Sequence, residues 1–145
     1  WTGQPIDVMG RDVRAAYDAA AAGSGAKAVI PVGEAFNRAM QTGVADPNPY
    51  DGVDFGKVNL WTYDQYHAST QGYYLEALVV FGAVTGLDPR SLGQNECSAY
   101  ELGMPVTEAK ALQQVAYDQL AASGAVKAAP LVLPKPVNPE RCSAH

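Results

Sequence analysis

Cysteine and basic residues are scarce in this chain of 145 residues. Cys97 and Cys142 are its only cysteines, and their wide separation excludes the close C-x-x-C pairing typical of zinc and redox sites. In an oxidising compartment the two could form one disulfide; the alternative is a pair of free thiols. The chain has 10 Lys and Arg, which are scattered, against 15 Asp and Glu. The resulting net charge of -5 argues against binding to nucleic acid or to an anionic membrane surface.

Long hydrophobic runs are also missing. The longest apolar stretch, from Leu75 to Val84, is interrupted by Glu76 and is far shorter than the roughly 20 residues that a membrane-spanning helix needs. We therefore expect no membrane span. The chain starts at Trp1 without a charged and then apolar leader, so we expect the numbering to begin inside a longer precursor or after processing. Any export signal would lie upstream, and the predicted location is secreted or periplasmic.

Apolar residues recur at helical spacing in four segments, each with residues suited to a helix start or stop. Gly23, Gly43, Gly86 and Gly124 follow the four segments, at the positions where helices commonly end. Between the second and third segments, prolines and glycines indicate that residues 43–68 are mostly loop. The predicted helices are residues 5–22, 34–42, about 70–85 and about 107–122, and Ser69 or Thr70 can cap the third. The predicted apolar stripe of the first helix is Ile6, Met9, Val13, Ala16, Tyr17 and Ala20. The predicted inward face of the third is Tyr74, Leu78, Phe81 and Thr85, and that of the fourth is Ala109, Leu112, Val115, Ala116 and Leu120.

One segment has the composition of a buried β-strand. Residues 26–32 form a short apolar run with β-branched side chains, and residues 58–61 form a weaker candidate. A doubly buried strand needs neighbouring strands to pair with its backbone N–H and C=O groups. Since the chain offers no such neighbours, we expect another segment or another chain to supply the rest of a sheet. A self-sufficient helical domain is a further interpretation, against which this solitary strand argues.

The densest group of reactive and aromatic side chains lies between Trp61 and His67. Asp64 precedes His67 by three residues, so its carboxylate could accept a hydrogen bond from the imidazole Nδ1–H and leave Nε2 free to take a proton from a hydroxyl. Spacing alone also fits a solvated Asp and a His that packs against the next helix. Trp61, Tyr63 and Tyr66 are candidates to line an acyl or sugar pocket, with ordinary core packing as the alternative.

The segment from Asp64 to Gly72, with the sequence D-Q-Y-H-A-S-T-Q-G, resembles the last conserved segment of SGNH/GDSL hydrolases, in which D-x-x-H-x-S/T-x-x-G opens the final helix. The resemblance continues through Gly86 and covers roughly residues 1–122. It implies an α/β fold, the C-terminal part of a flavodoxin-like three-layer parallel sheet that is incomplete in this chain. Residues 1–124 would belong to that domain and residues 125–145 would form a Pro-rich extended tail. By the same resemblance, Asp64 and His67 are the acid and base of a Ser-His-Asp triad.

The chain departs from that family in one major respect, because neither the nucleophilic serine nor the oxyanion donors have a counterpart here. We therefore expect a serine-dependent carboxylesterase or acetylesterase whose N-terminal half is missing or is a separate chain. The substrate would be a small-molecule or glycan ester, and no metal or organic cofactor is called for. The alternative is a non-catalytic module that binds a glycan or a protein and retains Asp64 and His67 as a remnant.

Overall fold

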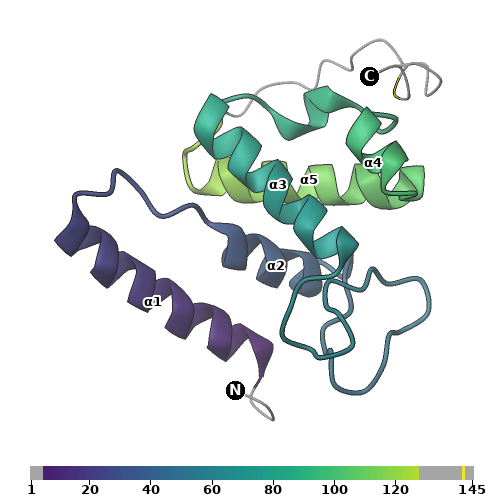
Figure 1. Cartoon of the computed structure of the whole chain (residues 1–145), viewed down its shortest axis with the longest axis horizontal. Helices are drawn as coiled ribbons and strands as arrows, with labels where there is room; N and C mark the ends of the chain where they lie inside the picture. Colours follow the sequence, from purple (N-terminus) through teal and green to yellow (C-terminus); the bar gives the residue numbers. More distant parts are fainter. Residues whose placement is uncertain (1–4, 128–141, 143–145) are drawn as a thin grey trace.

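The computed structural model describes residues 5–127 and Cys142, and in this part of the chain every regular element is a helix (Figure 1). The elements are α1 (Ile6–Ser24), α2 (Val32–Gln41), α3 (Thr70–Thr85), the short 3-10 helix η1 (Pro89–Leu92), α4 (Cys97–Glu101) and α5 (Val106–Ala122). The four helices predicted from the sequence are confirmed, with ends that differ by one or two residues. The helices η1 and α4 were not foreseen.

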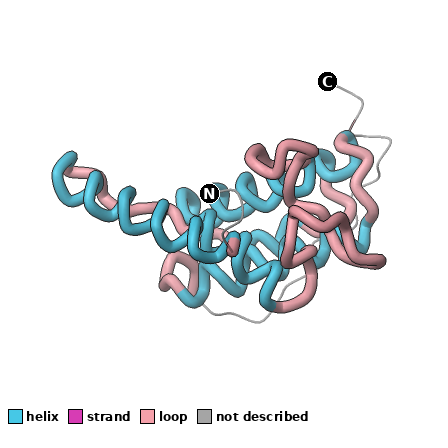
Figure 2. Tube along the Cα trace, turned by 90° about the horizontal axis from the view of Figure 1, so that it is seen from below, coloured by secondary structure: helices cyan, strands magenta, loops and turns pink. Residues whose placement is uncertain are grey.

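The prediction of a parallel-sheet α/β fold is wrong. Figure 2 shows no strand in the described part of the chain, and residues 26–31 are an irregular connection between α1 and α2. Lys27, Ala28 and Val29 make no backbone hydrogen bond to any other described residue. A β-prone run without a partner strand gains no ladder hydrogen bonds, so it stays irregular.

The end of the same run was also assigned wrongly, because Val32 begins a helix. The buried residues of α2 are Ala35, Phe36, Ala39 and Met40, which recur at helical spacing, and the amide of Ala35 donates to the carbonyl of Pro31 at 3.1 Å. Burying this face against α3 and α5 outweighs the strand propensity of the residues before it.

The weaker strand candidate at residues 58–61 contributes only isolated bridges, which tie the long loop together. Val58 pairs with Ala45 in parallel orientation, through hydrogen bonds of 3.0 Å from Val58 N to the Val44 carbonyl and 2.9 Å from Asp46 N to the Val58 carbonyl. Trp61 pairs with Ala68 in antiparallel orientation. These bridges join distant parts of the loop of residues 43–68 to each other without forming a sheet.

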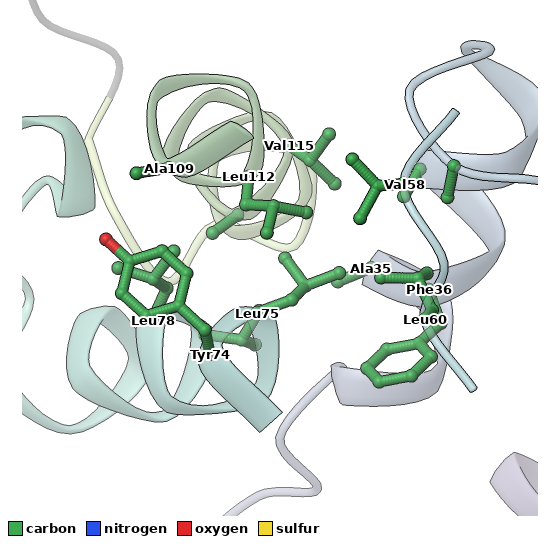
Figure 3. Packing of buried hydrophobic residues seen from close by; sticks show 14 of the residues in the cluster. Ala35, Phe36, Val58, Leu60, Tyr74, Leu75, Leu78, Ala109, Leu112 and Val115 are labelled. Atoms are coloured by element: carbon green, nitrogen blue, oxygen red, sulfur yellow. The ribbon is translucent and has the colours of Figure 1, made fainter. Parts of the chain in front are cut away.

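The core lies where α3 crosses α5, with α2 packed against both (Figure 3). The predicted inward stripe of α5 is confirmed, since all its members are buried: Ala109, Leu112, Val115, Ala116 and Leu120. On α3 the prediction holds for Tyr74 and Leu78, whereas Phe81 is only half-buried and Thr85 is exposed. Gly82 permits the close crossing, because a Cβ there would lie 2.3 Å from the Leu120 Cδ1.

Helix α1 is much less buried than the other long helices. Ile6 is its only buried residue, whereas Val13 and Tyr17 of the predicted apolar stripe are 40% and 62% exposed. An ion pair between Arg14 and Glu34 of α2 links it to the body. The helix therefore keeps most of its apolar face accessible.

A disulfide joins Cys97, at the start of α4, to Cys142. By the loop-entropy relation, closing a loop with a sequence separation of 45 contributes about 4 kcal/mol. The predicted extended tail, residues 125–145, lies mostly outside the described residues, although Val126 is buried in the core. No helix in the described part of the chain is long and apolar enough to cross a membrane.

A helical core centred on Leu112 makes a direct prediction about stability. Leu112 is fully buried between the helices, so Leu112→Ala should lower the free energy of unfolding by about 2 to 5 kcal/mol. Val84 lies on α3 and is 73% exposed, so Val84→Ala serves as the control and should change it by less than about 0.5 kcal/mol. Urea unfolding followed by circular dichroism measures both. Equal effects of the two substitutions would show that the core lies elsewhere.

Candidate active site

The loop that carries Asp64 and His67 is closed at its base by backbone hydrogen bonds. The amide of Thr62 donates to the carbonyl of His67 at 2.9 Å, and the amide of Ser69 donates to the carbonyl of Leu60 at 2.9 Å. At the turn itself, Gln65 has a positive φ of 53°. The six residues from 62 to 67 therefore form a compact turn with fixed ends.

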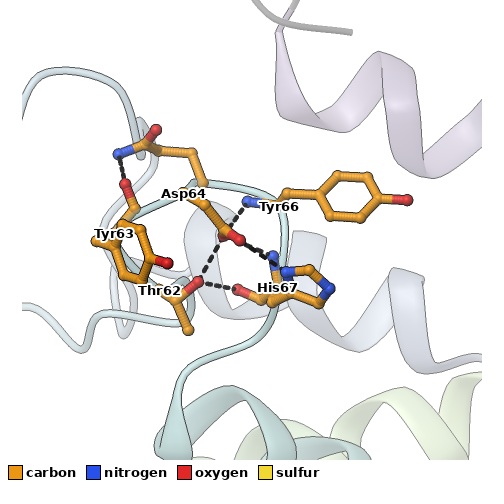
Figure 4. Close-up of polar contacts among 6 residues, drawn as sticks. Thr62, Tyr63, Asp64, Tyr66 and His67 are labelled. Carbon is orange, nitrogen blue, oxygen red and sulfur yellow. Dashed lines mark hydrogen bonds and ion pairs between the residues drawn. The ribbon is translucent and has the colours of Figure 1, made fainter.

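The Asp64 carboxylate organises this turn from within (Figure 4). Its Oδ1 accepts hydrogen bonds from the Thr62 hydroxyl at 2.5 Å and from the backbone amides of Tyr66 and His67, each at 3.0 Å. Its Oδ2 lies 2.7 Å from Nδ1 of the His67 imidazole. The Asp64 side chain thus links Thr62 at the start of the turn to the backbone and the imidazole of His67 at its end.

These contacts favour the ionised form of the acid. The hydrogen bond from Thr62 contributes most, followed by those from the His67 side chain and backbone, and together they lower the pKa of Asp64 well below its ordinary value of 3.8. A negative charge next to the imidazole stabilises the protonated ring, which is the requirement for a base that must hold a proton briefly.

One nitrogen of the His67 imidazole contacts Asp64, and the other has no hydrogen-bond partner among the described residues. Nδ1 faces the Asp64 carboxylate, which only accepts hydrogen bonds, so Nδ1 carries the proton and Nε2 is left as the acceptor. The His67 side chain is 61% exposed, and the Tyr66 ring packs against its face edge-on at 4.9 Å between centroids. The contact between Asp64 and Nδ1 of His67 is the one that the spacing predicted; the acid-base role of the pair stays a prediction.

The start of α3 anchors the turn to the body. Ser69 caps this helix as predicted: its hydroxyl accepts from the Gly72 amide at 3.1 Å and donates to the Asn59 carbonyl at 2.6 Å. Gly72 is required here, because a Cβ at that position would lie 2.4 Å from the Leu60 carbonyl oxygen. This contact explains the glycine in the D-x-x-H-x-S-x-x-G pattern as a packing requirement.

The three aromatic residues predicted to line a pocket are placed differently from one another. Trp61 packs edge-on against Phe36 at 5.5 Å and lines a groove beside His67, and Tyr66 lines the same groove. Tyr63 is 94% exposed and does not line that groove. Two of the three therefore line the groove beside the imidazole, and their role in binding a substrate stays a prediction.

The groove beside His67 has a volume of about 430 Å³. Its lining comes from α1, the first half of α2, the turn and the first half of α3. Most of the lining side chains are apolar or aromatic, and Glu76 is the one carboxylate and His67 the one imidazole among them.

No serine hydroxyl in the described part of the chain is hydrogen-bonded to His67, and four of these hydroxyls bind the backbone instead. Ser24, Ser91 and Ser123 each donate to a nearby backbone carbonyl at a helix end, and Ser69 is the cap described above. No hydrogen bond from a described residue reaches the imidazole Nε2. The described residues therefore place no serine hydroxyl in hydrogen-bonding contact with this nitrogen.

Thr62 is the member of the site that sequence reasoning missed. Its hydroxyl bridges the Asp64 carboxylate at 2.5 Å and the His67 carbonyl at 3.2 Å. A hydroxyl residue two positions before an Asp in a turn could have indicated this bond. Among the described residues, no group of three His, Cys, Asp or Glu side chains is arranged to hold a metal ion.

Comparisons with known proteins place this chain in no family. No family model matches it, and neither a curated protein nor a solved structure is significantly similar to it. Function must therefore be argued from the site itself.

The role of Thr62 can be tested through the titration of Asp64. Thr62→Val removes the strongest hydrogen bond to the carboxylate, so the pKa of Asp64 should rise toward 3.8. Carboxyl ¹³C NMR of Asp64 against pH measures the change, and Thr42→Val, whose hydroxyl bonds only to its own helix, is the control. An unchanged titration in Thr62→Val would contradict the assignment.

The lowered pKa of Asp64 also determines how the stability of the turn depends on pH. Because the pKa of Asp64 is lower in the folded chain than its ordinary 3.8, the ionised carboxylate stabilises the turn fully above that pH. The contribution is lost as the pH falls from there through the lowered pKa.

Proposed function

We propose that this chain contributes the acid-base pair of a serine-dependent ester hydrolase. The observation that carries the proposal is the 2.7 Å contact between Asp64 Oδ2 and His67 Nδ1, with the opposite ring nitrogen free of any described partner. An aspartate that fixes the tautomer of a histidine in this way prepares Nε2 to accept a proton from an attacking hydroxyl. The local resemblance of residues 64–72 to SGNH/GDSL hydrolases supports the same chemistry, although it does not extend to the fold.

In the proposed reaction, a serine supplied from outside the described residues attacks the ester carbonyl. His67 Nε2 takes the hydroxyl proton as the new C–O bond forms, and Asp64 stabilises the imidazolium. The proton then passes to the departing alcohol as its C–O bond breaks, which leaves an acyl-enzyme. Water, deprotonated by the same nitrogen, attacks the acyl group and releases the acid and the free serine.

The serine and the oxyanion donors are proposed to belong to the N-terminal half of the same hydrolase. One oxyanion donor alone is typically worth about 2.7 to 4 kcal/mol of barrier, so the chain without that half should be inactive. The proposed substrates are small-molecule or glycan esters, and the proposed location is secreted or periplasmic.

A second candidate function is a non-catalytic module that binds a glycan or a protein. The exposed tyrosines of the turn favour it, since Tyr63 and Tyr66 are 94% and 72% exposed on either side of Asp64. Exposed aromatic rings are typical of recognition surfaces. In this case the Asp64–His67 contact only shapes the turn.

Hydrolysis of p-nitrophenyl butanoate by the chain combined with the N-terminal half separates the two functions. His67→Ala should lower kcat/KM about 10²- to 10⁴-fold, because proton transfer loses its base. Asp64→Asn should also lower it, because the amide no longer fixes the Nδ1–H tautomer.

Asp54→Asn is the matched control for Asp64→Asn. Asp54 is also an exposed acid in a loop, and its side chain makes no hydrogen bond to a described residue. It should leave the rate unchanged. Full activity in His67→Ala would refute the proposed hydrolase, and binding without turnover would favour the module.

A further inference from the structure

The groove beside His67 is one end of a longer hollow that follows helix α1. A second hollow, of about 600 Å³, lies between α1 and the connection of residues 26–31. The two hollows adjoin each other along α1, since they share a set of lining residues: Met9, Gly10, Val13, Tyr17, Val32, Gly33 and Glu76. We call this combined hollow the α1 groove.

The length of the α1 groove follows from the helix that forms its wall. Lining residues extend along α1 from Ile6 to Ser24, which at the rise of an α-helix corresponds to about 27 Å. His67 lies at one end only, and the wall beyond it is formed by apolar side chains such as Val13, Tyr17 and Val29. The groove thus has one reactive end and a long apolar body.

Charge along the groove excludes anionic ligands. Arg14, the one cationic side chain among its lining residues, already donates to Asp18 at 2.8 Å and pairs with Glu34. Glu76 lines both hollows and forms no ion pair with a described residue. A carboxylate or phosphate would therefore meet a negative charge without a free cation to offset it.

We propose that the α1 groove binds the acyl chain of a neutral ester whose carbonyl lies at the His67 end. The position of the carbonyl rests on the proposed hydrolase function, whereas the binding of the acyl chain rests on the apolar lining, the length and the charge of the groove alone. The substrate class is accordingly an ester of a medium- or long-chain acid rather than an acetyl ester.

Methyl butanoate, methyl hexanoate and methyl octanoate are suitable probes, because they are neutral and the chain without its nucleophile does not consume them. Their affinities, measured by isothermal titration calorimetry, should rise with length by up to about fourfold for each added methylene that is buried. Val13→Asp places a charge in the groove and should lower the affinity for methyl octanoate at least tenfold.

Val106→Asp is the matched control, since Val106 is 43% exposed and Val13 40%, but Val106 does not line the groove. It should leave binding unchanged. Val13→Phe keeps the wall apolar while narrowing the groove, so it should reduce the gain from hexanoate to octanoate even if Val13→Asp unfolds α1.

Three results would overturn the proposal: affinities that do not depend on acyl length, equal losses in Val13→Asp and Val106→Asp, or a dimer that buries Tyr17 and excludes the esters. The His67→Ala variant keeps the two proposals apart. If it retains ester binding and also full turnover in the complete enzyme, the hydrolase assignment fails while the groove assignment stands.

Discussion

The Asp64 carboxylate is the group on which the geometry of the candidate site depends. Its two oxygens contact four hydrogen-bonding groups. One is the Thr62 hydroxyl, which precedes Asp64 in the turn, and the other three belong to Tyr66 and His67, which follow it. Satisfying a carboxylate with local donors fixes the turn without any long-range packing. The turn therefore orients the imidazole. The cap at Ser69 connects the turn to α3 and thus to the core.

The elements on the two sides of the groove differ in how well they are packed. The turn of residues 62–67 is attached to α3 and the loop bridges, which belong to the well-packed part of the molecule, whereas α1 forms the opposite wall of the groove with little burial of its own. Rigid support on one side and an accessible apolar face on the other are suited to binding a flexible apolar ligand next to a fixed polar group. The Arg14–Glu34 ion pair links α1 to α2.

Local signals in the sequence predicted local structure well. The spacing of Ala109, Leu112 and Val115 identified the buried face of α5, Ser69 was identified as a cap, and D-x-x-H placed the carboxylate against the correct ring nitrogen. Each of these features depends on residues a few positions apart in the sequence, for which the backbone geometry allows few other conformations.

Predictions that required distant partners failed. The run Ala26–Val32 has the composition of a buried strand, but strand formation depends on a second strand that composition cannot supply. The same limitation led us to discount a helical domain in favour of an incomplete sheet. Thr62 was missed for a different reason, since the bond from its hydroxyl to Asp64 is visible only once the turn is closed.

The protonation of the His67 ring tests the central claim most directly. Long-range ¹H–¹⁵N correlation NMR of the neutral imidazole distinguishes its two tautomers. The structure predicts a proton on Nδ1 and an unprotonated Nε2 in the wild-type chain, with loss of that preference in Asp64→Asn. A ring protonated on Nε2, or one whose tautomer does not respond to Asp64→Asn, would contradict the account.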